Sequence, residues 1–99
     1  MKIYFEEKDT AKILNNVKSV MAGRKLGEIV SFDIVGNDLK VTISKLGTST
    51  LLFAGQDKAA GTEFSLKEEK IAFIHKAFKD EVAGKIYKVV EQAGGKVTA

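Results

Sequence analysis

The side chain with the widest chemical range in this chain is His75, the single histidine among 99 residues. It lies in the run "IAFIHKAF", residues 71–78, where apolar residues recur at helical spacing and place the ring inside an apolar sector. Nucleophilic catalysis needs a base, a nucleophile and an orienting acid held together in space, and no spacing of Ser, Asp or Glu points at this histidine. We therefore interpret His75 as a residue at the edge of the core, with one ring nitrogen hydrogen-bonded.

Metal and disulfide chemistry is limited by the same composition. A zinc site normally takes several histidine or cysteine ligands, and this chain has one histidine and no cysteine. We expect no metal, no cofactor and no disulfide. The lack of cysteine also makes a cytoplasmic location the default expectation.

Three short motifs fail as binding sites. The pairs Gly84-Lys85 and Gly95-Lys96 lack both the glycine five positions earlier and the following Ser or Thr of a phosphate-binding loop. The run "DKAAGTE" has alanine and glycine where a calcium loop needs oxygen ligands. Glu68 and Glu69 are adjacent, so on a helix they diverge by about 100°. We interpret them as an acidic first helical turn and not as a glycosidase-like pair.

The overall composition is typical of one globular domain, residues 1–99, with 44% hydrophobic and 29% charged residues. There is no run of 18 apolar residues and no apolar leader at the N-terminus, so neither a membrane partner nor a signal peptide is expected. The net charge is +3, and all the basic residues are lysine except Arg24. Because arginine provides the planar fork that reads base edges, this bias argues against sequence-specific DNA recognition.

The elements that position these residues follow from periodicity. "MKIYFE" alternates and predicts a strand, and Asp9 or Thr10 can cap a helix over 10–22 that Gly23 ends. Alternation then predicts strands over 28–35, 38–45 and 48–54, with a tight hairpin at "GND". Residues 55–63 are expected to form a mobile polar loop.

The last third of the chain predicts one long helix. Ser65 and Glu68 form a capping-box pattern, and apolar residues from Ile71 to Ala93 fall on one helix face, with a kink or break possible near 80–84. The fold class is therefore α+β with the order β-α-β-β-β-α. A four-stranded, mostly antiparallel sheet is expected to be covered on one face by two helices, the C-terminal one long.

Four residues of that helix lie opposite its core stripe. Phe73 and Tyr87 are large, and Ala77 and Gly84 between them are small enough for another backbone to approach. They predict a protein-protein surface and, because self-pairing about a two-fold axis is common, a homodimer. The alternative is that the loop at 55–64 covers Phe73 while Tyr87 is a surface ring.

The order of elements from residue 10 onward is similar to that of double-stranded RNA-binding domains. That family, however, has a basic hairpin loop and a lysine cluster at the start of its last helix. Here the hairpin is "GND" and the predicted helix opens "LKEEK" with acids interleaved, so we do not assign the chain to that family. Weak, non-specific nucleic-acid contact through Lys67, Lys70 and Lys76 stays open as an alternative.

The sequence thus predicts a small non-catalytic protein-interaction or regulatory module, of the inhibitor or adaptor kind. Its partner is another protein of unknown identity or a second copy of the chain. The first alternative is a weak, non-specific nucleic-acid-binding protein. The second alternative is a small-ligand-binding domain with a pocket between the sheet and the long helix.

Overall fold

The computed structural model describes residues 1–98, apart from the side chains of residues 78 and 79. Six strands, two α-helices and two short 3-10 helices follow one another along the chain. In order they are β1 (Lys2–Phe5), α1 (Thr10–Met21), η1 (Lys25–Glu28), β2 (Val30–Val35), β3 (Asp38–Ser44), β4 (Thr48–Lys58), β5 (Gly61–Lys70), η2 (Phe73–Phe78), α2 (Lys79–Gln92) and β6 (Gly95–Thr98).

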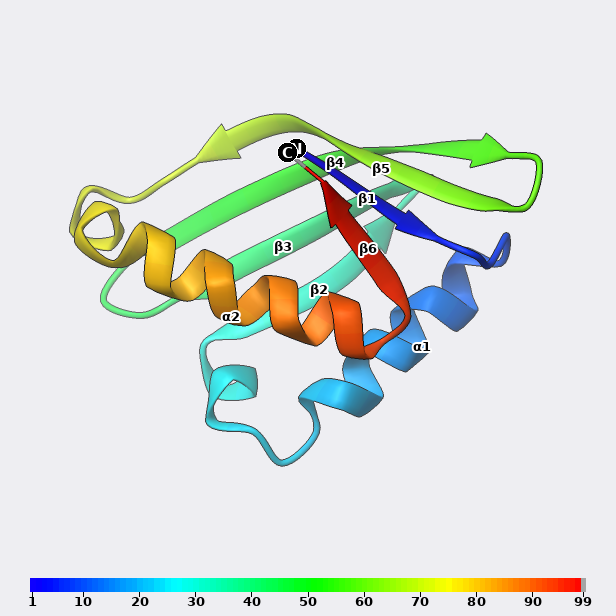
Figure 1. The fold of residues 1–99 in the computed structure, drawn as a ribbon. Coiled ribbons are helices and arrows are strands. Elements are labelled where there is room, and N and C mark those ends of the chain that lie inside the picture. The colour runs from blue at the N-terminus through cyan, green and yellow to red at the C-terminus, as the bar shows by residue number, and fades with distance from the viewer. Residues whose placement is uncertain (99) are drawn as a thin grey trace.

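The strands form one antiparallel sheet in the order β2-β3-β4-β5-β1-β6. Both α-helices cover the same face of this sheet (Figure 1). The core lies between the helices and the sheet because alternate strand residues point inward. The strands contribute Ile3, Phe5, Val30, Phe32, Leu39, Val41, Leu51, Phe53 and Phe64, and the helices contribute Ile13, Val17, Ile86, Val89 and Val90.

Several sequence predictions are confirmed in this fold. The class is α+β, with two helices and an antiparallel sheet. The side chain of Asp9 caps α1 by accepting from the Ala11 N–H at 2.9 Å, and Gly23 follows the helix with a φ of 77°. The hairpin at "GND" joins β2 to β3, with Val35 opposite Asp38.

The predicted count of four strands is wrong, since the sheet has six. The expected loop at 55–63 instead holds the end of β4 and the start of β5, which pair directly down to Lys58 and Gly61. The glycines that were interpreted as loop residues are there because other backbone comes close. A Cβ on Gly55 would lie 1.8 Å from the Asn37 carbonyl oxygen, and one on Gly61 would lie 2.0 Å from that of Phe5.

The single long helix over 65–93 is also wrong. Residues 65–70 belong to β5, and Ser65 pairs with Lys2 of β1 instead of capping a helix. Helical structure begins only at η2, and α2 starts at Lys79, close to the break considered near 80–84. The reason is pairing within the sheet: Leu66 lies opposite Phe53 of β4, and Lys70 lies opposite Thr50. Pairing with β4, extended by β1 up to Ser65, therefore overrides the local helical pattern.

Candidate functional site: a cavity between α2 and the sheet

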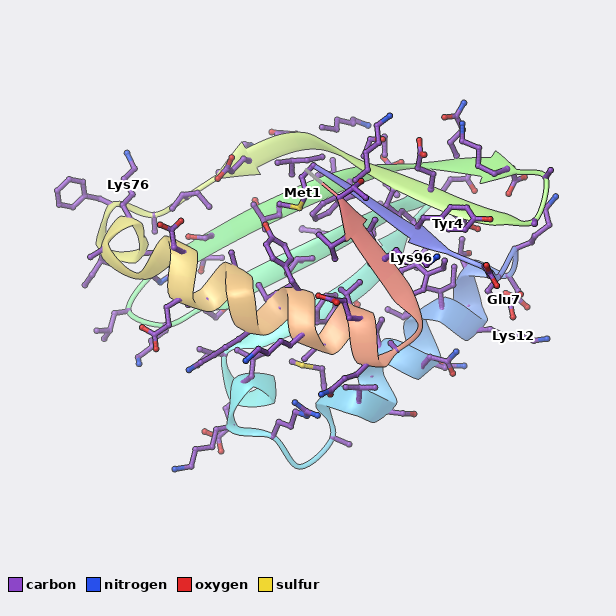
Figure 2. The ribbon with its side chains drawn as sticks, in the orientation of Figure 1. Met1, Tyr4, Glu7, Lys12, Lys76 and Lys96 are labelled. Carbon is purple, nitrogen blue, oxygen red and sulfur yellow. The ribbon has the colours of Figure 1, made fainter. Side chains whose placement is uncertain are left out.

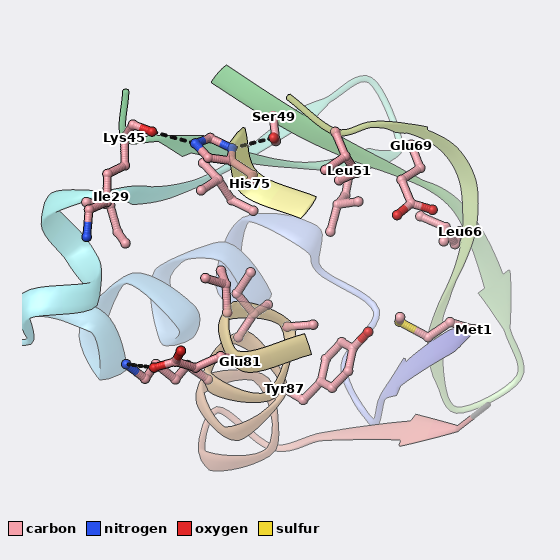
Figure 3. A pocket seen from close by; sticks show the side chains of 16 residues that line it. Met1, Ile29, Lys45, Ser49, Leu51, Leu66, Glu69, His75, Glu81 and Tyr87 are labelled. Carbon is pink, nitrogen blue, oxygen red and sulfur yellow. Dashed lines mark hydrogen bonds and ion pairs between the residues drawn. The ribbon is translucent and has the colours of Figure 1, made fainter. Parts of the chain in front are cut away.

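A cavity of about 350 Å³ lies between α2 and the inner face of the sheet (Figure 3). Its buried apolar lining residues are Ile43 and Leu51 from the sheet and Ile86 from α2, and the buried polar residues Ser49 and His75 line it as well. Half-buried Leu66, Ile71 and Val82 extend the apolar lining. The volume is at the lower end of the range of small-molecule pockets, which are mostly apolar with a few placed polar groups.

Charged side chains mark the outer part of this cavity. Lys45, Glu69, Glu81 and Lys85 line it and are solvent-exposed. Glu81 and Lys85 form an ion pair along α2 with 3.5 Å between Oε1 and Nζ. The lining therefore changes from an apolar interior to a charged rim. A ligand with one polar end would fit with that end at the rim.

Glu69 reaches this cavity because of an irregularity in the sheet. The pairing of β4 with β5 shifts register between Leu52 and Phe53, which face Glu68 and Leu66, so Lys67 has no partner in the ladder. One extra residue reverses the alternation that follows it. Glu69 thus comes opposite inward-facing Leu51, while Glu68 takes the outer face of the sheet.

Tyr87 of α2 provides a second polar group. Its side chain is half-buried and lines the cavity, with the phenolic oxygen directed to the same side of the cavity as Glu69 and Met1 (Figure 3). A hydroxyl can donate or accept a hydrogen bond, and a carboxylate only accepts. The two residues therefore place hydrogen-bonding groups at this side of the cavity.

His75 is buried beside the cavity, with 7% of its surface exposed. Its Nε2 lies 2.5 Å from the Lys45 carbonyl oxygen, and its Nδ1 lies 2.5 Å from Ser49 Oγ. Because a carbonyl only accepts, Nε2–H donates to the Lys45 carbonyl, and in that tautomer Nδ1 accepts a hydrogen bond from the Ser49 hydroxyl. Ser49 Oγ in turn accepts from the Ala72 N–H at 2.8 Å.

Both ring nitrogens of His75 are thus occupied within the protein. The ring ties η2 to the β3–β4 turn through Lys45 and to β4 through Ser49. This agrees with the interpretation of His75 as a residue of the core edge, and adds a second hydrogen bond to the one expected. Ser49 Oγ is also buried and accepts from the Ala72 N–H, so the hydroxyl is hydrogen-bonded on two sides within the protein.

The structure separates the four residues of the predicted protein-protein surface. Phe73 and Ala77 are exposed on η2, and Gly84 is exposed on α2. Tyr87 turns to the cavity between α2 and the sheet. Phe73 and Ala77 therefore lie on a 3-10 helix and Gly84 and Tyr87 on the α-helix that follows it, instead of on one long α-helix.

The three lysines considered for nucleic-acid contact are also dispersed. Lys67 Nζ lies 3.0 Å from Asp38 Oδ2, and Lys70 Nζ lies 3.3 Å from Glu68 Oε1. Lys76 lies exposed on η2. Two of the three charges are therefore balanced by a neighbouring carboxylate, which does not favour phosphate binding.

Sequence reasoning missed Ser49 and Glu69. Ser49 carried no signal, because a serine in an alternating strand is typical of an outward position. Glu69 was interpreted as part of a helix, and only the register shift in β5 turns it inward. The pocket between sheet and helix was named as an alternative without residues.

No group of three or more His, Cys, Asp or Glu that could hold a metal ion occurs among the described residues. Within residues 1–98, no helix has the length and apolar character required to cross a membrane. Comparison with protein families, with curated proteins and with solved structures gives no match for this chain. The functional argument therefore uses the geometry of this chain alone.

Proposed function

We propose that the protein binds a small, mainly apolar molecule in the cavity between α2 and the sheet, without catalysing a reaction on it. The observation that carries the proposal is the 350 Å³ cavity itself, whose interior is formed by Ile43, Leu51 and Ile86. Apolar surface that enters such a space from water gains about 25 cal/mol per Å² buried. Glu69 and Tyr87 support the proposal, since they can orient the polar end of a ligand.

Protein interaction or regulation through self-association, expected from the sequence, stays a prediction with less support than ligand binding. Phe73, Ala77 and Gly84 are exposed, whereas Tyr87 is half-buried and lines the cavity. Nucleic-acid binding is less favoured still, because Asp38 and Glu68 lie against two of the lysines. A cytoplasmic location likewise stays a prediction.

A cavity-filling variant tests the proposal. Ala83 lines the cavity from α2 and is half-buried, so Ala83→Phe places a ring in the cavity without removing a core side chain. Titration with the neutral apolar dye N-phenylnaphthylamine should give a fluorescence increase with the natural chain. Ala83→Phe should weaken dye binding at least about tenfold, the equivalent of losing one buried apolar group.

The matched control is Ala11→Phe, which adds the same ring on the exposed face of α1. It should bind the dye like the natural chain. The proposal is wrong if a panel of neutral, cationic and anionic apolar probes shows no saturable binding. It is equally wrong if Ala83→Phe, shown to be folded by circular dichroism, binds the dye as tightly as Ala11→Phe does.

A further inference from the structure

Three large apolar side chains are exposed at one end of the molecule. Phe73 is 89% exposed, Leu46 82% and Ile74 42%. Leu46 lies in the turn between β3 and β4, and Phe73 and Ile74 lie in η2. We call these three residues the apolar tip. Single exposed apolar residues are normal, but a cluster on touching segments indicates an interaction site.

The two segments that carry the apolar tip are in contact. The Lys45 carbonyl accepts from His75 Nε2 at 2.5 Å, which ties the turn to η2. A Cβ built on Gly47 would lie 3.5 Å from the Cβ of Ala72 and 3.7 Å from the Cγ2 of Ile74. Leu46 and Phe73 therefore project from neighbouring backbone that is held together by the buried histidine.

The backbone at Leu46 makes its exposure more informative. Its φ is 56°, in the left-handed region, which is unfavourable for a residue with a Cβ. Glycine or asparagine is the local preference at such a position. Neither the turn nor the core explains a leucine here, so its exposed side chain calls for an explanation outside the fold.

The two segments that carry the apolar tip contain lysines, while Glu69 and Glu81 line the adjoining cavity. Residues 44–48 and 70–77 contain Lys45, Lys70 and Lys76 and no aspartate or glutamate. Lys70 pairs with Glu68 on the outer face of the sheet, whereas Lys45 and Lys76 are exposed beside the tip. Figure 2 shows Lys76 at this end of the molecule, with its side chain projecting outward from η2.

We propose that the apolar tip docks the protein on an anionic lipid bilayer surface. Leu46 and Phe73 enter the boundary between headgroups and acyl chains, and Lys45 and Lys76 lie among the anionic headgroups. This is peripheral binding and requires no membrane-spanning helix. It departs from the sequence expectation of no membrane partner.

Area and charge favour this occupant over a second copy of the chain. One aromatic side chain buries about 150–250 Å², whereas a stable interface buries about 800 Å² on each partner. Three side chains do not reach that area, and two copies would bring like charges together at Lys45 and Lys76. A bilayer needs only a few inserted side chains plus the electrostatic attraction of lysines near its anionic surface.

The apolar tip also adjoins the proposed ligand cavity, because Lys45 and His75 line that cavity. Docking does not depend on ligand binding, however, and the two proposals are measured separately. Dye titration without vesicles tests the cavity, and vesicle sedimentation without dye tests the tip. Failure of one therefore leaves the other to be judged by its own result.

The test compares sedimentation with vesicles of phosphatidylcholine alone and vesicles of equal parts phosphatidylcholine and phosphatidylglycerol. We expect binding to the anionic vesicles, weakened by added salt because the attraction of the lysines is screened. Phe73→Ser should lower the partition coefficient at least about tenfold, from the loss of one inserted aromatic side chain. Leu46→Gly should also weaken vesicle binding. Because glycine is favoured at a positive φ, this change should not destabilise the fold, so weaker binding cannot be attributed to unfolding.

The matched control is Val35→Ser, which removes a 57% exposed apolar side chain at the end of β2, opposite Asp38 and so away from the β3–β4 turn. It should bind anionic vesicles like the natural chain. The proposal is overturned if the natural chain does not sediment with anionic vesicles, or if Phe73→Ser and Leu46→Gly bind as Val35→Ser does. It is also overturned if light scattering shows a dimer that Phe73→Ser dissociates, because a second copy then occupies the tip.

Discussion

Ser49 Oγ lies 2.5 Å from His75 Nδ1 although the two residues are 26 positions apart, and both side chains are buried. Ser49 also accepts from the Ala72 N–H, so one hydroxyl satisfies a ring nitrogen and a backbone donor together. The pair fixes η2 against β4 at the side of the cavity where the apolar tip begins. A structural role of this kind makes direct predictions for stability.

Ser49→Ala should destabilise the fold because it leaves two buried polar groups unpaired, Nδ1 of His75 and the N–H of Ala72. Each such group costs about 1–3 kcal/mol when it has no partner. Urea denaturation should therefore show a lower midpoint with an unchanged slope. His75→Gln should also lower stability, and dye binding by the folded fraction should persist in both variants.

The control for this prediction is Ser19→Ala on the exposed side of α1, where alanine is the better helix former. The double variant Ser49→Ala/His75→Gln should be less destabilised than the sum of the two single changes, since both remove the same contact. A Ser49→Ala protein as stable as Ser19→Ala would contradict the proposed role of the hydrogen bond.

The sequence suggested that Gly84 is small so that another backbone can approach it, and substitution by alanine tests this. A Cβ at Gly84 would meet nothing within 4 Å, and the residue is exposed in α2. Gly84→Ala should therefore raise the free energy of unfolding by about 0.5–1 kcal/mol. Thermal unfolding by circular dichroism measures this directly.

Gly95 is the matched contrast for Gly84. A Cβ there would lie 2.7 Å from Val90 Cγ1 and 3.0 Å from the Phe5 ring. Gly95→Ala should therefore lower stability by about 1–3 kcal/mol through overpacking. If Gly84→Ala destabilises the chain while Gly95→Ala does not, then Gly95 of β6 does not pack closely against Val90 of α2.

Local patterns in the sequence predicted the parts of the fold that local interactions determine. Asp9 and Gly23 correctly indicated where α1 begins and ends, and the alternation around "GND" located β2 and β3. The missing strands are defined by their partners in the sheet: β5 pairs with β4 and β1, and β6 pairs with β1 from the far end of the chain. Periodicity contains no information about such partners, so a helical pattern at 65–70 was the better local fit.

The candidate site was less predictable for the same reason. The direction of Glu69 depends on the register shift in β5, and the partner of His75 comes from a strand 26 residues earlier. Neither follows from residue spacing. The position of His75 at the core edge was predictable, because apolar neighbours on both sides already indicated burial.

Glu69 and Glu68 test the effect of this register shift on ligand preference, provided that the cavity binds a ligand. Glu69→Gln should weaken binding of an amine-bearing apolar probe about two- to fivefold, the range for a partly exposed charge pair, and leave a neutral probe unchanged. Glu68→Gln is the control, because Glu68 lies on the opposite face of the sheet. Equal effects of the two changes would show that Glu69 does not face the ligand.

Asp38 should make the stability of the β3–β5 region depend on pH. The Lys67 side chain, which donates to Asp38 Oδ2 at 3.0 Å, lowers the pKa of this carboxyl, and the Gly55 N–H that donates to Oδ1 at 3.2 Å lowers it further. A pKa lower in the folded than in the unfolded chain stabilises the fold above the ordinary aspartate value of about 3.9. That stabilisation is lost as the pH falls through the folded pKa, because protons then bind both states.

Asp38→Asn should therefore lower the urea midpoint at neutral pH, while the difference from the natural chain shrinks progressively below about pH 4. Lys67→Gln should reduce the same difference, since it removes the largest cause of the pKa shift. The control is Asp33→Asn at an exposed position of β2, which should not lower the urea midpoint in this way. An Asp38→Asn deficit that stays constant from neutral to acid pH would mean that the charge of Asp38 does not stabilise this contact.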